Sequence, residues 1–193
     1  MSEEINEELL GEMKRSVPYV AAVLLIVAGY YGVKNYLADR KASASAAVTS
    51  AYTTEELEEA VGKYGDTMTG PALKLKLAKK YFDTARYEAA LEIYEELSGK
   101  TGEAFGDIPT VGKAETLEAL GRTEEARKIY EDFAAAKPDN YLALTAKLGA
   151  VRCVALGDKE TALARLADLK ESVKDDETAA ARVAALEDVI KRR

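Results

Sequence analysis

The segment ALGRTEEARKIY, residues 119–130, returns in altered form 36 positions later as ALGDKETALARL, residues 155–166. The same interval carries Ala126 back to Ala90, within DTARYEAALEIYEEL. In each copy the apolar residues are spaced three or four positions apart, which is the spacing of one face of an α-helix. Self-similarity at a period in the mid-thirties is typical of helical hairpins that stack in a row. The repeat therefore predicts an all-α domain built from stacked hairpins.

Glycines mark two of the expected turns, at Gly121 and Gly157. Glycine has no Cβ, so it readily adopts the left-handed backbone that commonly ends a helix. Gly70 and Pro71 suit the start of a helix, so we expect ALKLKLAKKYF, residues 72–82, to be helical although its first residues alternate.

A capping box precedes the repeats. In TTEELEEAVGKYG, residues 53–65, Thr53 stands three positions before Glu56. A threonine and a glutamate at this spacing cap each other's backbone N–H groups at a helix start. We expect a short helix from Thr54 to about Lys63.

The segment SVPYVAAVLLIVAGYYGV, residues 16–33, has no charged residue, in a chain with 34 acidic and 27 basic side chains. As a helix it would be about 27 Å long, close to the ~30 Å hydrocarbon core of a bilayer. Ser16 suits a helix cap and Pro18 a first turn. The segment predicts a transmembrane helix over residues 16–37. Tyrosines favour the membrane interface, and those near its ends are Tyr19, Tyr30, Tyr31 and Tyr36.

Two other interpretations of this segment stay open. A cleaved export signal would explain the A-x-A patterns in KASASAAV, residues 41–48, but charged residues intervene and the leader MSEEINEELLGEM is acidic. A buried helix of a soluble core would show one apolar stripe, whereas the centre of the segment is apolar on every side. An uncleaved anchor is favoured. Its orientation is open, because the basic residues flanking it nearly balance: Lys14 and Arg15 before it, and Lys34, Arg40 and Lys41 after it.

The expected order of parts follows. An acidic tail (1–15) precedes the transmembrane helix (16–37). A helical neck and a short helix (38–69) lead to three hairpins (70–174), and an amphipathic helix closes the stack (175–193). The neck is expected to continue the transmembrane helix, since residues 34–50 contain neither Pro nor Gly.

Composition excludes several kinds of chemistry. The chain has no histidine and a single cysteine, Cys153, so it can form neither a His-dependent nucleophile, nor a His- or Cys-based zinc site, nor an internal disulfide. Cys153 lies among apolar residues and is expected to be buried. A net charge of −7 argues against nucleic-acid binding. We expect no catalytic residue, no metal and no cofactor, and therefore no enzyme. On residues 72–82, Lys76, Lys79 and Lys80 would form a basic side that either meets an acidic peptide or balances Glu88, Glu92 and Glu95.

The hairpins resemble the tetratricopeptide repeat, a 34-residue helical hairpin. The matching positions are Ala78, Tyr81, Ala90, Tyr94 and Leu97 in the first unit; Ala114, Leu117, Gly121, Ala126, Tyr130, Phe133 and Pro138 in the second; and Ala150, Cys153, Gly157, Ala162, Leu166 and Leu169 in the third. The early Trp of that family is missing, and the spacing here is 36.

This resemblance implies a tetratricopeptide-like solenoid whose first helices line a concave groove. The candidates to line it are Leu75, Lys79, Phe82, Val111, Glu115, Leu148, Val151 and Val154. The set is mainly apolar and lacks the Lys/Asn/Arg clamp with which some members bind C-terminal carboxylates. It suits either a hydrophobic segment of a client protein or the protein's own terminal helix.

The order of parts, with ADRKASASAAVTSAY (residues 38–52) after the apolar segment, resembles YfgM-type ancillary subunits of the bacterial Sec translocon. The resemblance implies an inner-membrane protein with a cytoplasmic N-terminus and periplasmic repeats. Its partners would be translocon subunits, periplasmic chaperones or exported clients, and its function that of a non-enzymatic chaperone or adaptor. The alternative is a structural scaffold subunit of a larger cell-envelope complex.

Overall fold

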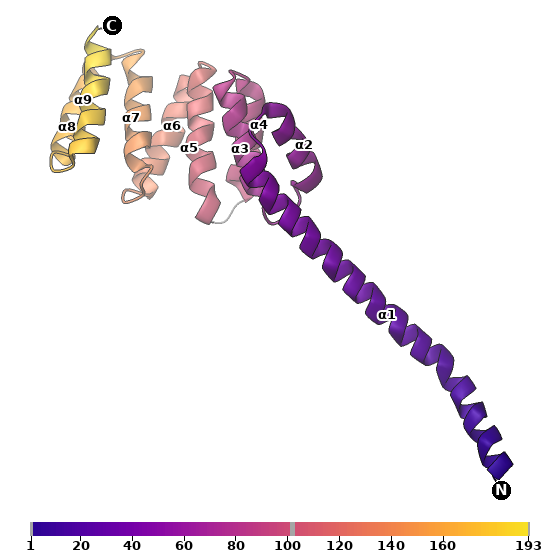
Figure 1. Ribbon diagram of the computed structural model, residues 1–193. Coiled ribbons are helices and arrows are strands. Elements are labelled where there is room, and N and C mark those ends of the chain that lie inside the picture. Colours follow the sequence, from indigo (N-terminus) through magenta and orange to yellow (C-terminus); the bar gives the residue numbers. More distant parts are fainter. Residues whose placement is uncertain (1, 101–102, 193) are drawn as a thin grey trace.

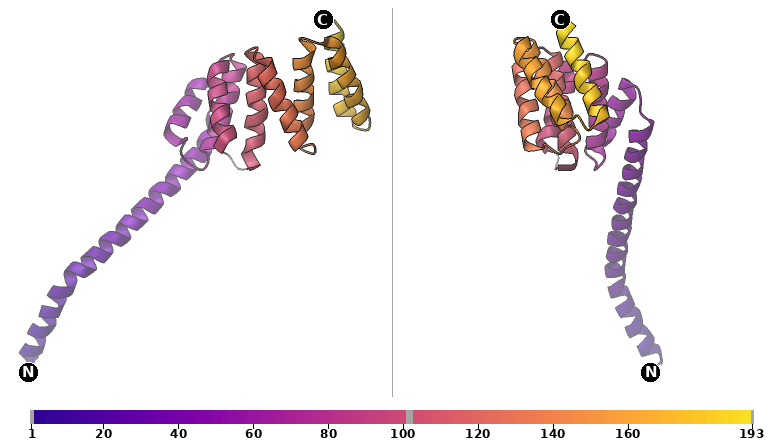
Figure 2. Two further views of the ribbon diagram at one scale, coloured as in Figure 1. Left: turned by 180° about the vertical axis from the view of Figure 1, so that it is seen from behind. Right: turned by 90° about the vertical axis from the view of Figure 1, so that its left-hand side faces the viewer.

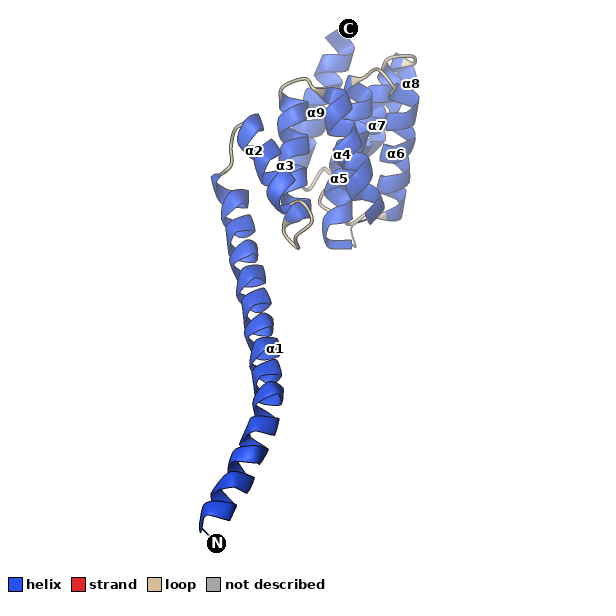
Figure 3. Cartoon of the chain, turned by 90° about the vertical axis from the view of Figure 1, so that its right-hand side faces the viewer, coloured by secondary structure: helices blue, strands red, loops and turns tan. Residues whose placement is uncertain are grey.

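A computed structural model describes the backbone of residues 2–100 and 103–192, and the side chains of residues 17–98 and 106–192. This part of the chain forms nine helices and no strand (Figure 3). The helices are α1 (Ser2–Ser50), α2 (Thr54–Tyr64), α3 (Gly70–Asp83), α4 (Tyr87–Lys100), α5 (Glu103–Ala119), α6 (Thr123–Ala136), α7 (Ala143–Ala155), α8 (Lys159–Ser172) and α9 (Glu177–Arg192). The all-helical class predicted from the sequence is confirmed.

Helices α2 to α9 stand side by side in a row, and α1 projects from one end of it (Figure 1). Each helix of the row packs against the next one along the chain. The pairs α3–α4, α5–α6 and α7–α8 are the hairpins predicted by the 36-residue interval. Their first helices also contact one another, α3 with α5 and α5 with α7, and α9 extends this series by contacting α7. The far end of the row is formed by α8 and α9.

The capping box before α2 is confirmed. The Thr53 side chain accepts a hydrogen bond from the Glu56 N–H at 3.1 Å, and the Glu56 carboxylate accepts one from the Thr53 N–H at the same distance. The N–H groups of Tyr52 and Thr53 both donate to the Glu56 carboxylate and hold its pKa below the ordinary value.

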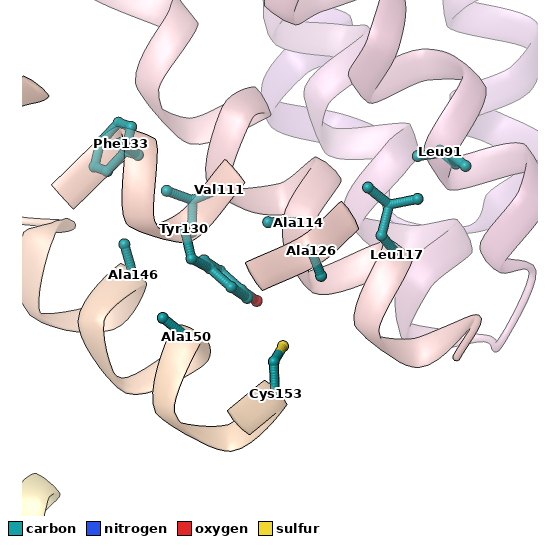
Figure 4. Close-up of a cluster of buried hydrophobic side chains, with 10 residues drawn as sticks. All are labelled: Leu91, Val111, Ala114, Leu117, Ala126, Tyr130, Phe133, Ala146, Ala150 and Cys153. Carbon is teal, nitrogen blue, oxygen red and sulfur yellow. The ribbon is translucent and has the colours of Figure 1, made fainter. Parts of the chain in front are cut away.

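The middle of the row is held by a cluster of buried side chains from α4, α5, α6 and α7 (Figure 4). Tyr130 lies at its centre and is fully buried. Alanines surround it at Ala114, Ala126, Ala146 and Ala150. Such small side chains let neighbouring helices approach closely. Cys153 belongs to the same cluster and is buried as expected, and its burial raises the pKa of the thiol to about 11.

Two tyrosines cross from one hairpin to a glycine of the next. A Cβ placed on Gly149 of α7 would lie 2.5 Å from the Cζ atom of Tyr130, and one on Gly112 of α5 would lie 2.7 Å from the Cε1 atom of Tyr94. Real Cβ atoms do not approach a ring this closely, so a larger residue at either site would have to displace the tyrosine ring. The third hairpin has Leu166 in place of the tyrosine, and Leu166 packs in a cluster with Val183 of α9.

The turns of the first two hairpins share one geometry. Ala85 has φ +58° and Gly121 has φ +76°, both in the left-handed region. In each turn the following N–H bonds a carbonyl five residues back, Arg86 to Tyr81 and Arg122 to Leu117. The left-handed backbone expected at Gly121 is therefore confirmed. At Gly157 the expectation is wrong, because that turn forms without a positive φ.

We predict that Ala85→Gly raises the free energy of unfolding by about 1 kcal/mol. A left-handed conformation costs a residue with a Cβ roughly 1–2 kcal/mol, and only part of this gain is lost to the greater freedom of glycine in the unfolded chain. Gly121→Ala should have the opposite effect, and Gly157→Ala, whose Cβ would meet nothing within 4 Å, should be neutral or slightly stabilising. Urea unfolding of the full chain in detergent measures all three. An Ala85→Gly variant less stable than the parent would contradict the assigned turn.

The neck continues the apolar helix, as expected: α1 runs without interruption from Ser2 to Ser50. The expectation that a helix starts at Ser16 is wrong. The predicted tail is the first part of α1, although the side chains of residues 1–16 lie outside the described part. Pro18 is consequently inside the helix, where it lacks an N–H and its ring crowds the carbonyl four residues back. Figure 2 shows α1 changing direction toward its N-terminal end.

Within the described part of the chain, α1 is the one helix long and apolar enough to cross a membrane. No part of its apolar window is buried inside the protein. Its large side chains stand free, with Leu25 74% and Ile26 71% exposed. The structure thus gives the segment no protein cover, unlike a helix of a soluble core, and the segment is compatible with a single-pass anchor.

Candidate functional site

A lysine of the first hairpin caps the end of α1. The Nζ atom of Lys76, in α3, donates to the Val48 carbonyl at 3.0 Å and also to the Ala51 carbonyl. It lies 4.4 Å from the centre of the Tyr52 ring. The last carbonyls of a helix have no partner within the helix and carry the negative end of its dipole, so an ammonium group is favourable there. Ala44, fully buried, packs at the same junction between α1 and the row.

A second contact lies closer to the apolar segment. Arg40 of α1 donates to the Asp66 carboxylate at 2.7 Å and to the Lys63 carbonyl at 3.0 Å. Arg40 follows Leu37, the end of the predicted transmembrane helix, by about 4.5 Å of helix rise. We call these contacts of Arg40, Ala44 and Lys76 the neck junction. They hold the row close to the end of the apolar segment.

We predict that Lys76→Met loosens the neck junction while leaving the row folded. Methionine keeps an apolar side chain but cannot donate to the two carbonyls. Spin labels at exposed Ser45 of α1 and exposed Glu92 of α4 should then report a broader distribution of distances. Lys128→Met is the matched control, because exposed Lys128 pairs only along α6, with Asp132 at 2.6 Å. An unchanged distribution in Lys76→Met would show that Lys76 does not hold α1.

The lysines expected to form a basic side have separate roles. Lys76 is engaged at the neck junction, and Lys79 pairs with Asp83 on its own helix. Glu95, one of the glutamates expected to balance them, pairs instead with Lys113 of α5 at 3.0 Å.

The eight groove candidates fall into different environments. Val111, Leu148 and Val151 are core residues, each no more than 5% exposed. Leu148 and Val151 pack in a cluster with Val183 and Ile190 of α9. In α7, therefore, the protein's own terminal helix covers these apolar candidates.

The remaining candidates differ in exposure. Leu75, Phe82 and Val154 are half-buried at the edges of the core clusters. Lys79 is exposed, and Glu115 is half-buried.

Phe82 and Glu115 come together in a cleft of about 460 Å³ where α3, α5 and α7 meet. We call it the α3–α5–α7 cleft, and its lining residues are Phe82, Glu115, Glu118, Ala119 and Arg152. Glu118, Ala119 and Arg152 were not predicted from the sequence. Glu118 could have been, because it lies one helical turn after Glu115. Arg152 could not, because its approach depends on how α7 packs against α5.

An ion pair occupies one side of this cleft. Arg152 donates to Glu118 through Nε and Nη2, at 2.8 Å each. The hydroxyl of buried Tyr130 donates to the same carboxylate at 3.1 Å. The hydrogen bonds to Glu118 raise the pKa of Arg152, and burial raises the pKa of Tyr130. Arg152 is therefore always charged, and its charge is balanced by a bidentate interaction with the Glu118 carboxylate.

The other acid of the cleft has no such partner. Within residues 17–98 and 106–192, Glu115 forms no ion pair and no hydrogen bond to another side chain. Burial raises its pKa above the ordinary value of 4.5; Arg152 and Lys79 act in the opposite direction, and Glu118 reinforces the rise.

This shift gives a pH-dependent prediction. A carboxyl group whose pKa is higher in the folded protein holds its proton more tightly there, so ionised Glu115 lowers stability at neutral pH. Glu115→Gln should be more stable than the parent at pH 7. The difference should shrink as the pH falls through the raised pKa of folded Glu115 and should vanish below the unfolded value, near 4.5. Urea midpoints at pH 7 and pH 4 measure it, and a Gln variant that gains nothing at pH 7 would contradict the prediction.

A second cleft, of about 470 Å³, opens between α6, α7 and α8. Its walls are mainly apolar, from Tyr130, Ala134, Ala150, Val151 and Leu169. At its rim the ion pair between Glu131 and Arg165, 2.7 Å apart, joins α6 to α8. Lys147 and Asp168 also line this cleft, and both are exposed to solvent.

Among the described residues, no group of three or more acidic or cysteine side chains is arranged to hold a metal ion. Comparisons with protein-family models, with curated proteins and with solved structures find no match to this chain.

Proposed function

We propose that this protein is a membrane-anchored, non-enzymatic chaperone or adaptor whose hairpins are tetratricopeptide-like and bind other proteins. Three hairpins with first helices in contact, closed by α9, support the solenoid interpretation. The cleft that these first helices form is a surface of the kind such proteins use for binding. The absence of histidine from the sequence and the neutralised Arg152–Glu118 pair support a binding role over catalysis.

The observation that carries the proposal is the continuity of α1. One helix includes the uncovered apolar segment and reaches the neck junction without a break. A flexible linker would let the row sample many positions, whereas a helix docked by Arg40 and Lys76 keeps it beside the membrane. An anchored surface meets its partners at a high effective concentration and does not need a high intrinsic affinity.

We further propose the bacterial inner membrane as the location, with the N-terminus in the cytoplasm, the row in the periplasm and the Sec translocon as neighbour. This part rests on the resemblance in the order of parts. Tyr19 near one end of the apolar segment and Tyr30, Tyr31 and Tyr36 near the other are exposed, as rings at the two membrane interfaces would be.

Photo-crosslinking within the membrane tests the neighbour. A crosslinking residue at Ala22 or Val27, both exposed on α1, should form an adduct with a translocon subunit in intact cells. Recovery of no such adduct would remove the translocon from the proposal. A single stoichiometric partner that survives high salt in mild detergent would instead indicate a scaffold subunit. Protease protection of the C-terminus in intact and lysed spheroplasts tests the orientation separately.

A further inference from the structure

The α3–α5–α7 cleft has a chemical character that goes beyond a general protein-binding surface. We propose that it binds a lysine or arginine side chain of a partner polypeptide, with the cation held between the Glu115 carboxylate and the Phe82 ring. This inference rests on the proposed function of the row as a protein-binding surface, and it names the kind of segment that is bound.

The cleft contains one carboxylate, that of Glu115, whose negative charge is not balanced by an ion pair within the described residues. Of the charged side chains that line it, Glu118 and Arg152 neutralise each other through two hydrogen bonds of 2.8 Å. Glu115 remains without an ion-pair partner in the described part of the chain. A half-buried carboxylate is poorly solvated, so a cation that reaches it gains more than one at the open surface.

An aromatic side chain forms one wall of the cleft. Phe82 lines it and makes a T-shaped contact with Tyr87, with ring centres 5.5 Å apart. The Nζ atom of Lys79 already lies 5.9 Å from the centre of the Phe82 ring. The ring therefore stands where cations are attracted to it. Lys79 itself forms its ion pair with Asp83 and not with Glu115.

The charges in the cleft disfavour an acidic ligand. An acidic ligand would need a free cation, but Arg152 already uses two donors on Glu118. It would also bring a second negative charge toward Glu115, which costs energy at short range. The small side chain of Ala119 completes the lining. The cleft consequently distinguishes a basic segment from an acidic one.

The test uses the full chain in nanodiscs of neutral phosphatidylcholine, so that basic peptides do not adhere to the lipid. The probes are fluorescein-labelled dodecapeptides of Gly, Ser and Leu with one central residue: Arg, its neutral isostere citrulline, or Glu. Fluorescence anisotropy should show the Arg peptide binding about tenfold more tightly than the citrulline peptide, because citrulline keeps N–H donors but lacks the positive charge that is attracted to the Glu115 carboxylate.

Two substitutions assign the effect to the cleft. Glu115→Gln should abolish the preference for Arg over citrulline. Glu124→Gln is the matched control, since Glu124 is exposed on α6 and pairs with Arg127, and it should keep the preference. Circular dichroism confirms that both variants remain helical.

The remaining outcomes are distinct. Equal binding of all three peptides, a preference for the Glu peptide, or a preference that survives Glu115→Gln would overturn the inference and leave the protein-binding function in place. Failure of the wild-type chain to bind any of the peptides would count against both.

Discussion

Replacing Gly149 with alanine is expected to lower the free energy of unfolding by about 1–3 kcal/mol, although alanine is the better helix former. The new Cβ would lie 2.5 Å from the Tyr130 ring. That ring is fully buried, and its hydroxyl is bonded to Glu118, so it has no room to move away. Thermal and urea unfolding of the full chain in detergent measure the loss. Gly112→Ala, against the Tyr94 ring, should behave similarly.

Gly62→Ala is the matched control, because Gly62 lies in α2 and a Cβ there would meet nothing within 4 Å. It should be stabilising by about 0.5–1 kcal/mol. The double variant Gly149→Ala with Tyr130→Leu should be less unstable than the sum of the two single changes, since the smaller side chain removes the clash. Gly149→Ala as stable as Gly62→Ala would contradict the close approach of α6 and α7.

Replacing Leu25 and Ile26 with arginine should release the protein from the membrane. After alkaline carbonate washing, the full chain should be in the aqueous fraction and not in the membrane pellet. Both side chains are more than 70% exposed at the centre of the apolar segment. Each arginine near the middle of a bilayer costs about 2.5–3.5 kcal/mol on insertion scales. Fractionation followed by immunoblotting with an antibody to the repeats measures the change.

The same number of arginines placed on the row controls for charge. Tyr141 and Leu156 are 70% and 59% exposed in loops, and their replacement by arginine should leave the protein in the pellet. Release of the unmodified chain by carbonate would refute the anchor, and with it the proposed function. Retention of the Leu25→Arg, Ile26→Arg chain would show that another part of the protein holds it to the membrane.

The hairpins were predictable because their signal is local and repeated. Ala90, Ala126 and Ala162 recur at 36-residue intervals, and each is fully buried in the second helix of its hairpin. The capping box of Thr53 and Glu56 is likewise a four-residue pattern, which does not depend on the rest of the fold.

Other features depend on contacts between distant segments. Lys76 was assigned to a basic surface, but its partners are carbonyls 25 and 28 positions earlier. The spacing of residues along the sequence does not show which distant segments will pack together. The left-handed turn at Ala85 was missed for a different reason: alanine is a poor residue for that backbone, and only its place 36 positions before Gly121 indicated it.

The candidate site was predictable in part. Phe82 and Glu115 follow from their places on first helices, and the structure brings both to one cleft. The apolar candidates Val111, Leu148 and Val151 do not line it, because they are buried in the core. A repeat position defines which helix a residue belongs to, but packing between hairpins decides how much of it stays open.

If α1 spans a bilayer as proposed, its unbroken course makes the orientation of the row depend on the lipid around it. A spanning helix that exceeds the hydrocarbon thickness tilts to fit. Because Ala44 and Lys76 lock α1 to the row, the helix and the row turn together as a lever, with about 28 Å of helix between Leu25 and Ala44. In a thinner bilayer the lever would lean further, and acyl-chain length would thereby change the orientation of the row relative to the membrane.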